Sequence, residues 1–182
     1  MIVELGAGSN GTATIWNSIS NSLASNITVA SSFTDITGTS GADSLKGNNL
    51  FNEFNGGAGN DRIYGGAGND FVDGRIGQDI LTGGAGDDVF FITHPTSNFK
   101  TADRITDFIT AKENDTLFLG KGVSKVWYRH QDVDGDGILD TVLFRQDENA
   151  QMTGIYAIID DFSTILTGQN FENEGLVITE VV

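Results

Sequence analysis

Acidic residues recur every nine positions in the middle of the chain, and glycines precede them at fixed distances. Residues 38–91 divide into six in-frame blocks of nine, and position 6 of every block is Asp or, once, Asn. These residues are Asp43, Asn52, Asp61, Asp70, Asp79 and Asp88. Carboxylates beside tightly turning backbone carbonyls are hard oxygen donors, and calcium takes about six to eight such oxygens in flexible geometry. The pattern therefore predicts calcium chemistry, for which the strict octahedron of magnesium is less suited.

Glycines at positions 1, 2 and 4 of the blocks allow backbone conformations that are closed to other residues. Their carbonyls can then turn inward beside the position-6 carboxylate. We include the position-5 amides Asn60 and Asn69 in the same predicted sites. The glycines of these sites are Gly56, Gly57, Gly59, Gly65, Gly66, Gly68, Gly74, Gly77, Gly83, Gly84 and Gly86.

The last three residues of each block are too few for anything but a short strand, whose period of two turns position 8 to one face. Position 8 is apolar in every block: Leu45, Phe54, Ile63, Val72, Leu81 and Phe90. Two blocks make one coil of turn, strand, turn and strand, and stacked coils pair their strands in parallel. The sequence thus predicts a parallel β-roll over residues 38–91, with position 8 forming a thin apolar core.

Composition narrows the classes of function. The formal net charge is −15, with 25 acidic and 10 basic residues, which argues against nucleic acid and anionic membranes as partners. The absence of cysteine excludes disulfides and thiolate metal sites, and two histidines make zinc a poor candidate. The N-terminus lacks the basic and apolar regions of a secretory signal peptide, and no apolar run is long enough to span a membrane.

The blocks GGAGNDRIY and GGAGNDFVD match the consensus G-G-x-G-x-D-x-U-x at every defined position. The chain therefore resembles the RTX, or hemolysin-type, repeat family of secreted bacterial proteins. The resemblance covers residues 38–91 and extends to 119 through segments similar to those that close such rolls. It implies calcium ions held between turns two blocks apart, which gives about four sites in the repeats. It also implies export by type I secretion machinery, to the outside of the cell or its surface.

Two blocks depart from the consensus. In the second block, Leu50 replaces the position-4 glycine and Asn52 replaces the aspartate, so we expect the site between Asn52 and Asp70 to be weak or empty. In the fifth block, Arg75 replaces the second glycine, and its long side chain can point outward.

Asp132, Asp134, Asp136 and Asp140 have the D-x-D-x-D-G-x-x-D spacing of an EF-hand-like loop. Strand-like segments flank this loop where an EF-hand has helices, and position 12 is Leu143 where an EF-hand has Glu. Two interpretations stay open here, one more calcium site or an ordinary β-hairpin turn.

The remaining chain divides into a polar N-terminal segment, residues 1–37, which is either strand or linker, and a β-rich C-terminal cap, residues 92–182, which also contains a possible secretion signal. The fold class is all-β, a parallel β-roll followed by an antiparallel β cap. Because an open roll end is a sheet edge, we expect Asp103 or Asp107 to help finish the last coil.

No catalytic pattern such as H-E-x-x-H or G-x-S-x-G is present, so we predict no enzyme in this chain. The favoured function is a calcium-binding module that folds on binding Ca²⁺ and stabilises or assists secretion of a bacterial extracellular protein. The alternatives are an accessory module of a secreted protease, lipase or polysaccharide epimerase, and an adhesive or surface-layer calcium protein with an unidentified protein or glycan partner.

Overall fold

The computed structural model describes residues 2–4, 11–14, 26–28, 33–108, 113–121, 123–146, 149, 151–162, 166–171 and 176–181. Within these residues the fold is made of strands and two short 3₁₀ turns, η1 (Phe99–Thr101) and η2 (Gly168–Asn170), without an α-helix. No helix in this part of the chain is long and apolar enough to cross a membrane.

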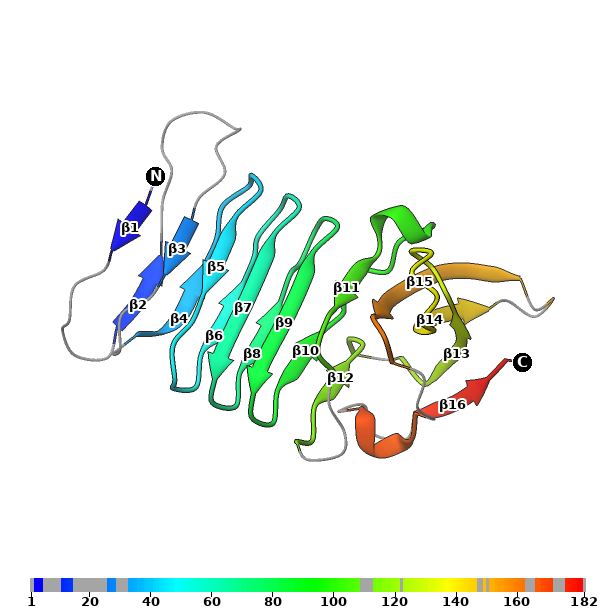
Figure 1. The fold of residues 1–182 in the computed structure, drawn as a ribbon. Helices are drawn as coiled ribbons and strands as arrows, with labels where there is room; N and C mark the ends of the chain where they lie inside the picture. The colour runs from blue at the N-terminus through cyan, green and yellow to red at the C-terminus, as the bar shows by residue number, and fades with distance from the viewer. Residues whose placement is uncertain are drawn as a thin grey trace.

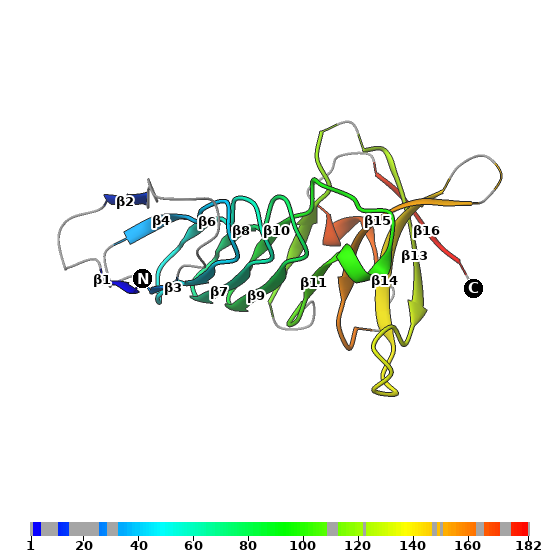
Figure 2. The ribbon, with the colours of Figure 1, turned by 90° about the horizontal axis from the view of Figure 1, so that it is seen from above.

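The first two thirds of the molecule is a parallel β-roll, in which the chain alternates between two facing sheets (Figures 1 and 2). One sheet begins with β1 (Ile2–Glu4), β3 (Asn26–Thr28), β5 (Ser44–Lys46), β7 (Arg62–Ala67), β9 (Ile80–Ala85) and β11 (Asp103–Ile105). The other contains β2 (Gly11–Thr14), β4 (Phe33–Thr37), β6 (Glu53–Asn55), β8 (Phe71–Asp73), β10 (Val89–Phe91) and β12 (Thr116–Phe118).

Strands of the repeats pair in parallel with a shift of eighteen residues, two blocks, as the sequence predicts. Leu45 lies opposite Ile63 and Ile63 opposite Leu81 in one sheet, while Phe54 lies opposite Val72 in the other. All six position-8 side chains are at most 2 % exposed and belong to one apolar core between the sheets. The predicted β-roll and its core are confirmed.

The same register begins before Gly38. Ile36 of β4 lies opposite Phe54 and is fully buried, and the backbone of Ile27 lies opposite that of Leu45. Ile27, Ile36 and Leu45 are nine residues apart. The roll therefore includes strands that carry no glycine motif.

The C-terminal part extends the first sheet at the end of the roll. β15 (Met152–Ile159) pairs in parallel with β11, and β14 (Asp140–Gln146) and β13 (Lys125–Gln131) follow in antiparallel order. β16 (Val177–Glu180) pairs in parallel with β13. The cap is therefore antiparallel over β13–β15, as expected, but its junction with the roll and its last strand are parallel. One apolar core runs through roll and cap, from Ile36 to Phe171.

Candidate metal centre

Four consecutive turns of the roll, those of blocks three to six, share a backbone conformation. Position 4 has positive φ in all four, at Gly59, Gly68, Gly77 and Gly86, with values from 115° to 153°. Position 2 is also positive in all four, although in block five the residue is Arg75. Blocks one and two do not share this conformation, since among the described residues Thr39, Asn48 and Leu50 lack positive φ.

Arg75 tolerates its left-handed conformation, φ 72°, because its neighbour holds it from two sides. Its backbone N–H donates to Asp73 Oδ1 at 3.0 Å, and its Nε lies 3.0 Å from Asp73 Oδ2. The side chain is about half exposed, so it points outward as the sequence predicts. The turn of block five thus keeps its shape without the second glycine.

The position-6 carboxylates form two buried ladders along the edges of the roll. In each step, the backbone N–H of one position-6 residue donates to Oδ1 of the residue two blocks later. Asp43 donates to Asp61 and Asp61 to Asp79, both at 2.8 Å, while Asp70 donates to Asp88 at 2.7 Å. Asn52 keeps this contact, donating to Asp70 Oδ1 at 2.7 Å. Replacement of the second-block aspartate therefore leaves the ladder intact.

Both ladders continue beyond the repeats. Asp79 N–H donates to Asp103 Oδ1, and Asp88 N–H donates to Asp115 Oδ1, each at 3.0 Å. Asp107 accepts from the N–H groups of Gly83 and Gly84 at 3.0 and 2.8 Å, so it covers the last glycine turn. Asp103 and Asp107 lie where the sequence predicts, whereas Asp115 was missed.

In four ladder carboxylates, the second oxygen has no hydrogen-bond partner in the part of the chain that the structure describes. Among the described residues, the buried Oδ2 atoms of Asp61, Asp70, Asp79 and Asp88 accept no hydrogen bond. Asp43 differs, because its Oδ2 accepts from Thr39 N–H at 2.6 Å and from the Thr39 hydroxyl at 3.0 Å. The orphaned oxygens thus occur in blocks three to six, the blocks that share one turn conformation.

At two turns, a glycine carbonyl and an orphaned oxygen both lie close to the Cα of a position-1 glycine. A methyl group placed on Gly56 would lie 2.5 Å from Asp61 Oδ2 and 2.7 Å from the carbonyl oxygen of Gly74. At Gly65 it would lie 2.4 Å from Asp70 Oδ2 and 2.4 Å from the carbonyl oxygen of Gly83. Only glycine fits at position 1, because it lies between a carboxylate and the carbonyl of the turn two blocks later. Carboxylate and carbonyl oxygens beside an unmatched buried charge fit calcium.

The side chains of the position-5 amides make hydrogen bonds between turns, and their place in the predicted calcium sites stays a prediction. Asn60 Oδ1 accepts from Gln78 N–H, and Asn69 Oδ1 accepts from Asp87 N–H, both at 3.1 Å and near the surface. They connect turns two blocks apart with hydrogen bonds.

Burial raises the pKa of five ladder carboxyls, which lie away from water beside other carboxyls. The pKa is raised to about 7 for Asp61 and Asp70, and to about 6 for Asp79 and Asp88. For Asp103, burial and the charge of Asp79 raise it to about 8. Ionising these carboxyls in the metal-free roll is therefore less favourable than ionising an ordinary aspartate, and a nearby cation removes that cost.

We expect mildly acidic pH to stabilise the metal-free roll, and so to replace part of the stabilisation that calcium gives. The folded pKa values exceed the ordinary value near 4, so the metal-free roll binds extra protons and loses stability as the pH rises from about 4 to about 8. Far-UV circular dichroism of metal-stripped protein should show more β structure near pH 5 than near pH 8. High salt screens exposed repulsion only, so the trend should persist in it. A metal-free roll better ordered at the higher pH would contradict this prediction.

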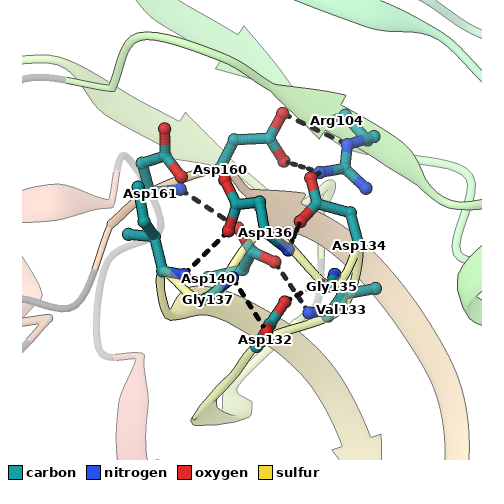
Figure 3. A network of polar contacts seen from close by, with 11 residues as sticks. Arg104, Asp132, Val133, Asp134, Gly135, Asp136, Gly137, Asp140, Asp160 and Asp161 are labelled. Carbon is teal, nitrogen blue, oxygen red and sulfur yellow. Dashed lines mark hydrogen bonds and ion pairs between the residues drawn. The ribbon is translucent and has the colours of Figure 1, made fainter.

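The second acidic loop is the tip of the hairpin between β13 and β14 (Figure 3). Oxygens of Asp132, Asp134 and Asp136 lie within 4.8 Å of one another. Asp132 accepts from Gly135 N–H at 2.6 Å and from Gly137 N–H at 3.1 Å, as in an ordinary polar turn.

Other contacts fix the base of this loop. The buried Asp140 accepts from Val133 N–H at 2.9 Å and from Asp161 N–H at 3.1 Å. Arg104 forms ion pairs with both Asp134 and Asp160 (Figure 3). Its Nη2 lies 2.9 Å from Asp134 Oδ2 and 2.6 Å from Asp160 Oδ1. The strand flanks are as predicted, and calcium binding by this loop stays a prediction.

Comparison with known proteins bears on the repeats and the fold. Residues 46–81 and 55–90 match the family model of the RTX calcium-binding nonapeptide repeat. The solution structure of the AlgE6R2 subunit from the Azotobacter vinelandii mannuronan C5-epimerase is similar, with TM-score 0.55 and 23% identity over 76% of this chain and 92% of that chain. The AlgE6R3 subunit of the same enzyme gives TM-score 0.48 and 24% identity over 92% of this chain and 85% of that chain. No curated protein matches significantly.

Proposed function

We propose that this chain, which carries RTX calcium-binding nonapeptide repeats over residues 46–90, is a calcium-folded module of a bacterial extracellular protein. Calcium completes the roll by neutralising the buried aspartate ladders. We assign the chain no reaction of its own. The module stabilises the protein to which it belongs and assists its export through type I secretion machinery.

The observation that carries this proposal is the coincidence of two independent features in blocks three to six. These four blocks have the turn conformation with positive φ at positions 2 and 4, and each contains a buried carboxylate oxygen that accepts no hydrogen bond from the described residues. A buried, unpaired carboxylate is strongly unfavourable. A divalent cation beside each orphaned oxygen removes that penalty.

The proposed ligands follow from the neighbours of each orphaned oxygen. Asp61 with the Gly74 carbonyl, and Asp70 with the Gly83 carbonyl, would hold one ion each. Asp79 with Asp103, and Asp88 with Asp115, would hold two more where the ladders leave the repeats. We expect the turns of Asp43 and Asn52 to bind more weakly, because the first carboxylate is used by Thr39 and the second residue is an amide.

Calcium concentration would then decide where the module folds. Extracellular calcium modules bind at about 10⁻⁴ to 10⁻³ M, well above the free calcium of a cytosol. The module would stay unfolded inside the cell before export and would fold outside the cell.

A second candidate function is an accessory module of a secreted enzyme. The AlgE6R2 subunit, which is similar in fold, belongs to an enzyme, a mannuronan C5-epimerase.

A calcium titration tests the proposal. Far-UV circular dichroism should change from disordered to β-rich as calcium rises to millimolar, and magnesium should not produce this change. Calorimetry should detect about four ions in the repeats, one for each orphaned oxygen. A spectrum unchanged by calcium, or restored equally by magnesium, would show that the ladders need no specific cation.

A further inference from the structure

We propose that the cleft between the roll and the cap binds a neutral oligosaccharide. The cleft has a volume of about 900 Å³ and is lined by Gln78, Asn98, Phe99, Lys100, Arg104, Gln131 and Val133. A second hollow of about 510 Å³ shares Gln78 and continues past Asn60 and Ile76 to His94 and Thr101. Both volumes are in the range of ligand pockets, and the two hollows meet at Gln78, so we treat them as one groove.

The lining differs from the rest of this acidic molecule. None of the described residues that line either hollow is Asp or Glu, although the chain has 25 acidic residues. The side chains of Gln78, Lys100 and Gln131 make no hydrogen bond or ion pair with the described residues. Each carboxamide both donates and accepts, which suits the paired hydroxyls of a sugar.

An aromatic side chain, Phe99, also lines the cleft. The Phe99 ring lines the cleft and is held by the Arg129 guanidinium, which lies 5.7 Å from its centroid. Such a ring offers an apolar surface to the C–H face of a sugar.

Hydrogen bonds and strand pairing hold the backbone around the cleft in place. Asn98 accepts from Lys100 N–H at 2.9 Å at the start of η1, and Thr96 exchanges two backbone hydrogen bonds with Ile155 of β15. Arg104 and Gln131 extend from strands paired on both sides. A fixed frame lowers the cost of ordering a ligand.

Charge favours a neutral ligand over an acidic one. Arg104 is already paired with Asp134 and Asp160, which leaves Lys100 as the free cation lining the main hollow among the described residues. With a net charge of −15, the molecule stays negative even after binding four divalent ions, so it repels a polyanion. Peptide binding by strand addition is also disfavoured, because β11 and β13 each have partners on both sides.

Gln78 precedes Asp79 of the ladder, so the groove requires a folded roll, and the inference depends on the proposed calcium folding to that extent. The test is an NMR titration of ¹⁵N-labelled protein in millimolar calcium with cello-, malto- and mannohexaose, and with a hyaluronan oligomer of matched length as the acidic probe. At least one neutral oligomer should give saturable shifts at the side-chain amides of Gln78 and Gln131, and the acidic oligomer should bind more weakly.

Variants locate the contact. Gln131→Ala removes one or two hydrogen bonds and should weaken binding about tenfold, as should Phe99→Leu. Gln169→Ala, an exposed glutamine in η2 outside the groove, should bind like the wild type. Circular dichroism in calcium shows first whether each variant is folded, which separates failure of the roll from failure of the cleft.

The inference is overturned if folded protein binds none of the neutral oligomers, if the acidic oligomer binds as well as they do, or if Gln131→Ala and Gln169→Ala bind equally.

Discussion

In a calcium chelator, the amide hydrogens of residues 38–91 should exchange nearly as fast as those of an unfolded chain, and millimolar calcium should restore slow exchange. The ladders bring Asp61, Asp79 and Asp103 into line in a buried position, with one oxygen of Asp61 and of Asp79 lacking any partner among the described residues. Without a cation, these carboxyls oppose folding through burial and mutual repulsion.

The size of the expected effect follows from mass action. At millimolar calcium and dissociation constants of about 10⁻⁴ to 10⁻³ M, each site stabilises the folded form by about 0.4 to 1.4 kcal/mol. Four such sites contribute about 2 to 6 kcal/mol, which is comparable with the whole stability of a small domain. We therefore expect calcium to decide whether the roll is folded.

Hydrogen exchange with mass spectrometry can separate the roll from the cap in one experiment. The antiparallel strands β13–β15 are stabilised by buried apolar residues such as Val126, Leu143 and Ile158, so they should lose less protection in the chelator. Magnesium at equal concentration is the control for ionic strength. Equal protection of residues 38–91 with and without calcium would rule out the mechanism.

The roll could be predicted from the sequence because its period is local. Leu45, Ile63 and Leu81 occupy the same position of the block, and that position determines their face of the strand. The weaker signal of Ile27 and Ile36 lies in the same nine-residue frame, but without glycines it could not be distinguished from ordinary polar sequence. Strand pairing, which a local pattern does not encode, shows that the coil already exists there.

The candidate site could be predicted only in part. Asn114-Asp115-Thr116-Leu117 repeats the pattern of Asn69-Asp70-Phe71-Val72, and this signal could have identified Asp115 as the end of the second ladder. The sequence analysis did not recognise this signal because the glycines of the repeats do not precede it.

The use of Asp43 Oδ2 by Thr39, and the hydrogen bonds of Asn60 and Asn69, depend on contacts between side chains and turns. The spacing of residue types does not specify such contacts. The cleft between roll and cap was also invisible to sequence analysis, because its lining comes from four separate segments.

The second large effect concerns two adjacent aspartates, Asp87 and Asp88, whose replacement by asparagine changes the charge equally. Asp88 is buried, with Oδ1 accepting from Asp70 N–H and Oδ2 orphaned beside Gly83. Asp87 is exposed, and its Oδ1 accepts from Asn114 N–H at 2.9 Å, which an amide oxygen can also do. Asp88→Asn should remove one calcium ion and raise the calcium midpoint of folding roughly tenfold, about 1.4 kcal/mol, while Asp87→Asn should change both little.

The effect of Asp88→Asn on folding should change from destabilising to stabilising when calcium is absent. Burial raises the pKa of Asp88 to about 6, so near neutral pH its charge opposes folding of the metal-free roll, and a neutral amide removes that penalty. An excluded osmolyte can fold metal-free protein, because it favours compact states. Asp88→Asn should need less osmolyte than the wild type, although it needs more calcium. If Asp88→Asn instead needs more osmolyte as well as more calcium, the carboxylate of Asp88 supports the turn rather than the ion. If Asp88→Asn behaves like Asp87→Asn, the ladder is not the calcium site.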